Sequence, residues 1–300
     1  NRGRTAVNAA ARLAAVPMLT LALLQIGAVP TVNIAPGVNL PLLSLGTGSG
    51  MLKPAVNVTE AVWLWLISGG SAVDTAYDYS DEERIAKGIE AAGAGAPFVT
   101  TKIPCTSYAK AAAHIDSNLQ QLGTDFTDLL LMHFPCRSPF GGNTADTWRA
   151  IEAALTAGKA RAIGVSNFDV DDLHQLRKTA RRWPPAVNQC SLSVGYHDDA
   201  TIKYCNSNKI TYMSYSPLCG GPNGSSCQHG SVMDIPVVQQ ISKVHNVSSA
   251  QIALKWIVQQ GIPLATAVAN EQYAREDLDL WSWGDLSADE MKKLADAKLF

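Results

Sequence analysis

The chain has 300 residues, of which 47% are hydrophobic and 17% are charged, and its formal net charge is −2. This composition supplies enough apolar surface for a folded core and excludes an intrinsically disordered chain. The small net charge and the lack of a basic run argue against nucleic acid or an anionic membrane as the main partner. The sequence contains no CxxC or HExxH motif, so no metal site is indicated. We therefore expect a small-molecule partner and no metal.

The N-terminal segment differs from the rest of the chain. Three arginines within the first 12 residues precede an apolar stretch over residues 13–29. A basic region followed by an apolar region and small residues is typical of a signal peptide, although this stretch is short for a membrane span. We expect residues 1–29 to be a leader or signal segment and residues 30–300 to be a single domain. A working signal would imply a secretory or organellar location.

The rest of the sequence alternates between two patterns. Two β-type runs around Pro36 and Gly37 predict a hairpin, and the final residues from Leu286 predict an outer amphipathic helix. Between them, eight apolar runs predict strands at residues 42–45, 72–73, 98–101, 128–132, 162–165, 186–188, 210–214 and 262–266. Helical patterns occur at residues 58–67, 82–92, 108–121, 144–156, 170–179, 201–206 and 249–259. No GxGxxG motif follows the first strand, which argues against a Rossmann fold. The order favours an α/β fold, a (β/α)8 TIM barrel.

Polar side chains follow six of the predicted strands, at the point where each apolar run ends. They are Asp74, Lys102, His133, Ser166 with Asn167, Gln189 and Tyr215. Their spacing of about 23 to 33 residues is the length of one βα unit. The C-terminal ends of barrel strands meet at one mouth, where active sites form. We therefore expect these side chains to lie close together.

Four of the residues near this mouth have complementary chemistry. Asp74 and Lys102 end neighbouring strands and are expected to pair. Tyr79 follows Asp74 by five residues, and a nearby ammonium is expected to lower its pKa and make the phenol a proton donor. His133 is expected to hydrogen-bond the same carbonyl oxygen, and Tyr77 is a rival to Tyr79 as the donor. No side chain supplies hydride, so carbonyl reduction implies a nicotinamide cofactor.

The motifs that contain these residues resemble those of the aldo-keto reductase superfamily over residues 31–297. In chain order they are VDTAYDY at 73–79, VTTK at 99–102, DLLLMH at 128–133, GKARAIGVSNF at 158–168, VNQ at 187–189 and YSPL at 215–218. The resemblance implies a monomeric, cytoplasmic enzyme that reduces an aldehyde or ketone with NADPH or NADH. It also implies that the N-terminal hairpin plugs the bottom of the barrel.

The resemblance assigns roles to individual residues. Tyr79 would be the general acid, Asp74 and Lys102 its tuning pair, and His133 the residue that orients the substrate. Ser166, Asn167 and Gln189 would hold the nicotinamide carboxamide, Tyr215 would stack on the ring, and residues 216–218 would contact the pyrophosphate. The full set of implied cofactor contacts is Gly46, Thr47, Asp74, Ser166, Asn167, Gln189, Tyr215, Ser216, Pro217, Leu218, Arg275, Glu276 and Asp277.

The cofactor's 2′-phosphate clamp is the main departure from the family pattern. The usual Lys-Ser step is replaced by Ala267-Val268 or, in another alignment, by Leu264-Ala265, and the usual arginine by Tyr273. Glu276 is retained, and Asp277 replaces an asparagine. Without its basic partners a phosphate loses charge-assisted hydrogen bonds worth about 1.5–3 kcal/mol each. We expect a weakened NADPH preference, with use of NADH.

Two further features leave alternatives open. Gly48 stands where the family often has an aromatic residue, so the substrate pocket is expected to be open or to be built by residues 218–233. Cys105 and Cys136 lie three residues past Lys102 and His133, and Cys219 and Cys227 share one loop. These pairs are candidates for disulfides in an oxidising compartment, and the alternative is six free thiols.

Other functions remain open from the sequence. One is a catalytically silent nicotinamide-binding subunit, like the regulatory members of the superfamily. Another is an unrelated barrel enzyme in which Lys102 forms a Schiff base with a carbonyl substrate.

Overall fold

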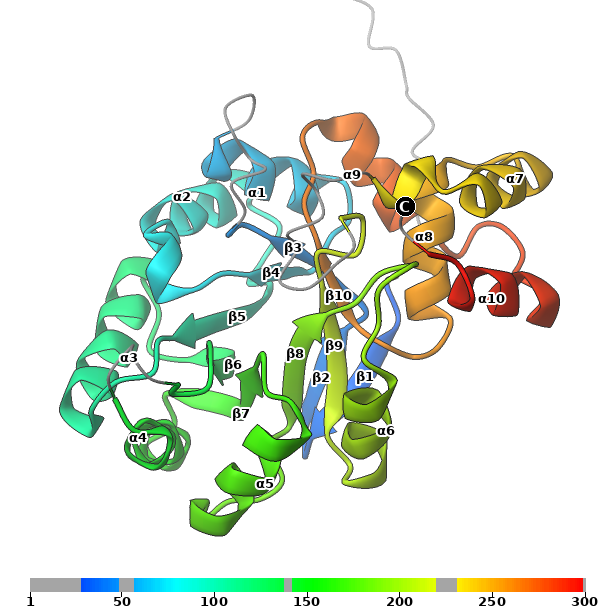
Figure 1. Cartoon of the computed structure of the whole chain (residues 1–300). Coiled ribbons are helices and arrows are strands. Elements are labelled where there is room, and N and C mark those ends of the chain that lie inside the picture. Colours follow the sequence, from blue (N-terminus) through cyan, green and yellow to red (C-terminus); the bar gives the residue numbers. More distant parts are fainter. Residues whose placement is uncertain (1–27, 49–56, 138–141, 220–230, 299–300) are drawn as a thin grey trace, which may run out of the picture.

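The computed structural model describes residues 28–48, 57–137, 142–219 and 231–298. At its centre, eight parallel strands form a closed barrel in the order β10-β3-β4-β5-β6-β7-β8-β9 (Figure 1). The strands are β3 (Leu43–Gly46), β4 (Ala72–Asp74), β5 (Phe98–Ile103), β6 (Thr127–Met132), β7 (Ala160–Ser166), β8 (Val187–Ser191), β9 (Thr211–Tyr215) and β10 (Leu264–Thr266). The predicted TIM barrel is confirmed.

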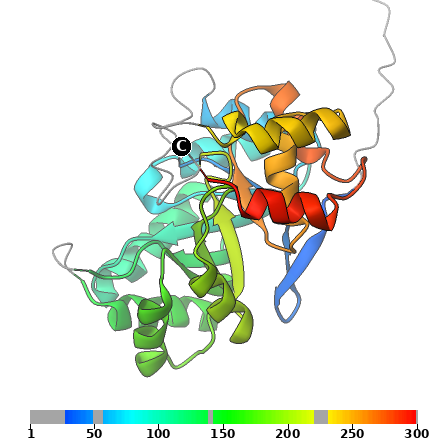
Figure 2. The ribbon, with the colours of Figure 1, turned by 45° about the vertical axis from the view of Figure 1, so that its right-hand side comes forward.

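Helices form the outer layer, as Figures 1 and 2 show. They are α1 (Val58–Ile67), α2 (Glu82–Ala92), α3 (Tyr108–Leu122), α4 (Thr144–Thr156), α5 (Val170–Thr179), α6 (Asp199–Ser207), α7 (Pro236–His245), α8 (Ser249–Val258), α9 (Glu271–Leu278) and α10 (Ala288–Ala295). Short 3-10 helices η2 (Tyr77–Tyr79) and η4 (Val232–Asp234) lie in loops. Because the strands are parallel, their C-terminal ends share one mouth.

The N-terminal hairpin closes the opposite end of the barrel. β1 (Thr31–Ala35) pairs antiparallel with β2 (Val38–Pro41), and the turn uses Gly37 at φ 74°. Val38 and Leu40 of β2 are buried in one apolar cluster with inward-facing strand residues such as Leu129 and Met213. This packing confirms that the hairpin plugs the barrel.

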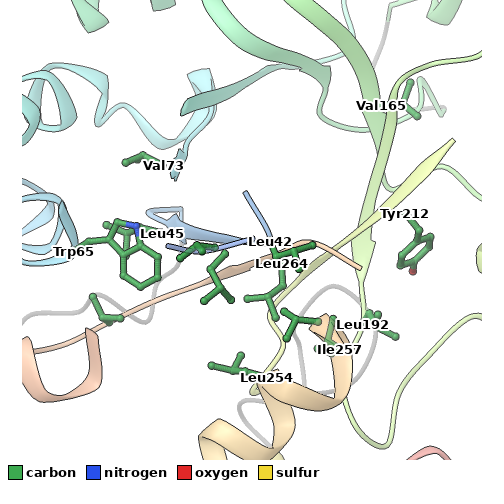
Figure 3. Close-up of a cluster of buried hydrophobic side chains, with 14 of the residues drawn as sticks. Leu42, Leu45, Trp65, Val73, Val165, Leu192, Tyr212, Leu254, Ile257 and Leu264 are labelled. Carbon is green, nitrogen blue, oxygen red and sulfur yellow. The ribbon is translucent and has the colours of Figure 1, made fainter. Parts of the chain in front are cut away.

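The main core lies between the barrel and its helices. Figure 3 shows Leu254 and Ile257 of α8 beside Leu264 of β10. Burial of each such side chain contributes roughly 1.5–3 kcal/mol. Trp65 of α1 is fully buried, and its indole nitrogen donates to the carbonyl of Ala72 at 3.0 Å, which ties this helix to the start of β4. The rigid outer layer therefore holds the strand ends in place.

Two helices, α7 and α9, are missing from the sequence prediction, although their end signals are present. Pro236 occupies the first turn of α7, and Asn246 ends that helix in the left-handed region. Asn270 caps α9 by accepting a hydrogen bond from the amide of Tyr273. The predicted C-terminal helix is confirmed as α10, which begins with a capping box at Ser287.

The expected leader lies outside the described residues, apart from its last two positions. Within the described ranges, no helix has the length and apolar character needed to cross a bilayer.

Candidate active site

A buried ion pair lies at the mouth of the barrel. Asp74 is opposite Thr100 in the β4–β5 register, so Lys102, two residues further along β5, lies on the same face. Lys102 Nζ contacts Asp74 Oδ1 and donates to the carbonyl of Thr75 at 3.1 Å. Burial opposes the charge on Lys102, but the Asp74 carboxylate with the Tyr79 hydroxyl raises the Lys102 pKa above its ordinary value. The predicted pairing is confirmed, and Lys102 is a buried cation.

Tyr79 lies above this ion pair. Lys102 Nζ is 5.4 Å from the centre of the Tyr79 ring, and the hydroxyl is 3.4 Å from Nε2 of His133. Burial raises the pKa of Tyr79 above its ordinary value, although the Lys102 charge opposes that shift. The expectation of a lowered Tyr79 pKa is therefore wrong, because loss of hydration outweighs the ammonium. The phenol holds its proton at neutral pH.

Local packing distinguishes Tyr79 from its neighbours. Tyr77 points away and stacks on His114 of α3, with ring centres 4.0 Å apart, so it is no longer a rival as proton donor. A Cβ built on Gly48 would lie 1.9 Å from atoms of the Tyr79 ring. The Tyr79 ring therefore packs directly on Gly48 and takes the space that a side chain at this position would fill. The open substrate pocket expected from the sequence stays a prediction. The segment 220–230 lies outside the described residues.

His133 follows β6 and joins Tyr79 to a residue that the sequence analysis missed. Its Nδ1 lies 3.0 Å from Oδ2 of Asp78, within the turn that carries Tyr79. Burial lowers the pKa of His133 below its ordinary value, although the Asp78 hydrogen bond opposes this shift. In the sequence, the one signal for this contact was that Asp78 directly precedes Tyr79. The contact itself depends on the 3-10 turn η2, which directs the Asp78 side chain toward the end of β6.

The residues expected to hold a carboxamide form one hydrogen-bonded network. Gln189 Nε2 donates to Asp74 Oδ2 at 2.6 Å, and Ser166 Oγ donates to the carbonyl of Gln189 at 2.8 Å. Asn167 Nδ2 donates to Ser166 Oγ at 3.0 Å, and the Tyr215 hydroxyl donates to Asn167 Oδ1 at 2.7 Å. Hydroxyl and amide groups supply the donors and acceptors that a carboxamide needs, and the Tyr215 ring offers a flat surface. The chemistry of this network fits a nicotinamide.

The remaining predicted contacts lie around this network. Gly46 pairs with Asp74 in the β3–β4 register, and the Thr47 amide donates to the Asp74 carbonyl at 3.0 Å. Ser216, Pro217 and Leu218 follow β9, and Ser216 adopts a left-handed φ of 53°. These residues surround the same mouth.

Three of the implied cofactor contacts, Arg275, Glu276 and Asp277, lie on α9 and are not part of this hydrogen-bonded network. The Arg275 guanidinium binds Glu271 Oε1 at 2.6 Å, and Glu276 accepts from Gln272 at 2.8 Å. Asp277 is buried and accepts from Thr266 Oγ1 at 2.9 Å, and burial raises the Asp277 pKa to about 7. The only cation of this helix, Arg275, is therefore already paired with a carboxylate.

A disulfide joins Cys105 and Cys136 at the same end of the barrel. Their Cα atoms are 5.3 Å apart and the sequence separation is 31, which corresponds to roughly 3–4 kcal/mol of stabilisation in the chain-entropy view. Cys219 is also disulfide-bonded, and its expected partner Cys227 lies outside the described residues. The alternative of six free thiols is therefore wrong.

This pairing predicts the outcome of a thiol assay. In denatured protein without reductant, an alkylating agent is expected to label Cys190 and Cys205, which are free, and to leave Cys105 and Cys136 unmodified. After treatment with reductant, mass spectrometry is expected to show labels on all four. Labelling of Cys105 and Cys136 before reduction would show that the bond is absent.

Comparisons with known proteins agree with this geometry. The family model described as "Aldo/keto reductase family" matches residues 44–298. Glyoxal reductase of Bacillus subtilis is 33% identical over 272 residues, covering 88% of this chain and 91% of the relative. An NADPH-dependent codeinone reductase of Papaver somniferum is 31% identical, covering 89% of each protein. A Bombyx mori aldo-keto reductase solved with NADP aligns with a TM-score of 0.81 at 27% identity, covering 89% of this chain and 92% of that one. The chain belongs to the aldo/keto reductase family.

Proposed function

We propose that the protein reduces an aldehyde or a ketone to the alcohol with NADPH or NADH, and that Tyr79 is the general acid. The observation that carries the proposal is the position of the Tyr79 hydroxyl, 3.4 Å from His133 Nε2 and above the buried Lys102–Asp74 pair. The family's reductase activity and the NADP in a solved relative support it.

Each residue of the site has a distinct role in this proposal. A bound nicotinamide supplies the hydride. Tyr79 donates its proton to the oxygen that becomes the alcohol, and the Lys102 charge stabilises the phenolate that is left. Asp74 keeps Lys102 charged in a site where burial alone would favour the neutral amine. Ser166, Asn167 and Gln189 orient the carboxamide.

A substrate panel tests the reaction class. Purified protein is mixed with aldehydes and ketones of differing size, and absorbance reports oxidation of NADPH or NADH. We expect turnover that depends on the carbonyl compound. Loss of absorbance at the same rate without a carbonyl compound, or no turnover across the panel, would contradict the proposal.

We also propose that NADPH preference is weak. Val268 is fully buried, Tyr273 is half exposed, and Arg275 is paired with Glu271, so none supplies a free cation. In fluorescence titrations we expect dissociation constants for NADPH and NADH that differ by less than about tenfold, because a larger difference needs at least one charge-assisted hydrogen bond to the 2′-phosphate. If NADPH binds more than 100-fold tighter, this account is wrong. Arg275→Gln then shows whether that residue compensates.

The disulfide bears on cellular location. Disulfides persist in oxidising compartments and are rare in the cytosol. We propose that the protein works in a secretory compartment, in line with the signal-like order of residues 1–29. Expression of the full chain with a C-terminal fluorescent tag tests this, and diffuse cytosolic fluorescence would contradict it.

A further inference from the structure

The imidazole of His133 is held in one orientation by several contacts. Nδ1 lies 3.0 Å from Asp78 Oδ2, and the Phe134 ring stacks on the imidazole with centres 4.6 Å apart. The Tyr79 ring meets the imidazole edge-on at 5.4 Å, and Asn167 Nδ2 donates to the His133 carbonyl at 2.9 Å. Nδ1 therefore faces a carboxylate while Nε2 faces the Tyr79 hydroxyl.

The chemistry of the carboxylate determines which nitrogen carries the hydrogen. An ionised carboxylate only accepts hydrogen bonds, so Nδ1 must be the donor toward Asp78. Burial lowers the pKa of His133, and a neutral imidazole has a single N–H group. Nε2 is then an acceptor, and the partner within reach is the Tyr79 hydroxyl, 3.4 Å away.

We propose that Asp78 is a positioning residue that fixes His133 in the Nδ1–H tautomer, so that Nε2 accepts the hydroxyl hydrogen of Tyr79. This inference rests on the proposed role of Tyr79 as the acid. It changes the role expected for His133, because Nε2 has no hydrogen to donate to a substrate carbonyl in this tautomer. In the substrate-free site the phenol hydrogen therefore points at Nε2. It turns from Nε2 to the carbonyl oxygen when Tyr79 acts as the acid.

The arrangement also has a consequence for the reverse reaction. When an alcohol is oxidised, Tyr79 must be a phenolate before it removes the alcohol's hydroxyl proton. Nε2 is a group within reach that can take the phenol proton, which breaks the O–H bond and forms an N–H bond; the imidazolium then passes that proton to solvent. The transfer costs free energy, because burial raises the pKa of Tyr79 and lowers the pKa of His133. Asp78 stabilises that imidazolium at 3.0 Å, while Lys102 stabilises the phenolate. The other charges near His133 are Lys102 and Asp74, which pair with each other.

Imidazole ¹⁵N NMR spectra of the full chain test the tautomer without cofactor or substrate. His133→Gln assigns the His133 resonances among the six histidines of the chain. We expect Nδ1 protonated and Nε2 unprotonated in the native protein. In Asp78→Asn, the side-chain amide accepts or donates equally well, so we expect a mixture of tautomers. Asp78→Glu is expected to restore the native spectrum.

Kinetics of the same variants test the consequence. Asp78→Asn is expected to lower kcat roughly tenfold with an unchanged dissociation constant for the cofactor. That loss is smaller than the ~10⁴-fold effect of a wrong tautomer where histidine is itself the base. Glu83→Gln, which removes an exposed carboxylate from the next helix, is the matched control and is expected to leave kcat unchanged.

Two results would overturn the inference. One is an Nε2–H tautomer in the native protein. The other is an Asp78→Asn variant that keeps both the native spectrum and the native kcat. The tautomer is measured without catalysis, so this test does not depend on the proposed function. The proposed function fails in a different experiment, if turnover survives Tyr79→Phe.

Discussion

Tyr79→Phe is expected to lower kcat for carbonyl reduction by about 10²–10⁴-fold, the usual contribution of a positioned general acid. Phenylalanine keeps the ring above Lys102 and beside Gly48 but removes the hydroxyl that faces His133. We expect the dissociation constant for the cofactor to stay the same, since the carboxamide network does not include Tyr79.

A matched variant separates the two neighbouring tyrosines. Tyr77→Phe removes a hydroxyl from the same turn, on a ring that stacks on His114 rather than facing the ion pair. We expect this variant to keep native turnover. If Tyr79→Phe keeps turnover as well, the acid role is wrong. If no carbonyl compound is turned over while cofactor still binds the native chain, the silent binding subunit becomes the better account.

Lys102→Met is expected to destabilise the fold and to abolish turnover. The lysine is 1% exposed and Asp74 is 3% exposed, so removal of one partner leaves a buried charge without its counter-ion. Such losses cost about 3–5 kcal/mol, which chemical denaturation measures. Because Lys102 lowers the Tyr79 pKa against the effect of burial, its loss raises that pKa further. Any residual alcohol oxidation, which needs the phenolate, should therefore require a higher pH.

A double variant distinguishes stability from catalysis. Asp74→Asn combined with Lys102→Met removes both charges, and the amide oxygen introduced at position 74 can still accept the hydrogen bond from Gln189. Replacement of a buried ion pair by neutral groups is often close to neutral for stability. We expect stability to recover while turnover stays lost. Recovery of both would show that the pair has only a structural role.

The state of Lys102 also bears on the Schiff-base alternative. A Schiff base requires the neutral amine as the nucleophile. Here the carboxylate of Asp74 raises the Lys102 pKa despite complete burial, so the amine is protonated. Borohydride is therefore not expected to trap a substrate on Lys102.

The fold and the position of the site were predictable from the sequence because both depend on local patterns. Apolar runs marked the strands, and the polar residue after each run marked the mouth. Asp74, Lys102 and His133 converge because parallel strands end at the same side of a barrel. These residues are about one βα unit apart in the sequence, and that spacing was enough to predict that they meet at one end of the barrel.

Features that depend on burial or on loop geometry were not predictable. The direction of the Tyr79 pKa required knowing that burial outweighs the neighbouring ammonium. The Asp78–His133 contact required the shape of the η2 turn. The spacing of Cys105 and Cys136 suggested a disulfide, but choosing it over free thiols required the distance between their Cα atoms.

The most direct test of the account follows the hydride itself. An aldehyde that the protein turns over is incubated with cofactor deuterated at the transferable position, and the alcohol is examined by mass spectrometry. The account predicts one deuterium on the carbinol carbon with the native protein, and labelled alcohol formed about 10²–10⁴-fold more slowly with Tyr79→Phe. An alcohol without deuterium, or labelling at the native rate by the Tyr79→Phe variant, would contradict it.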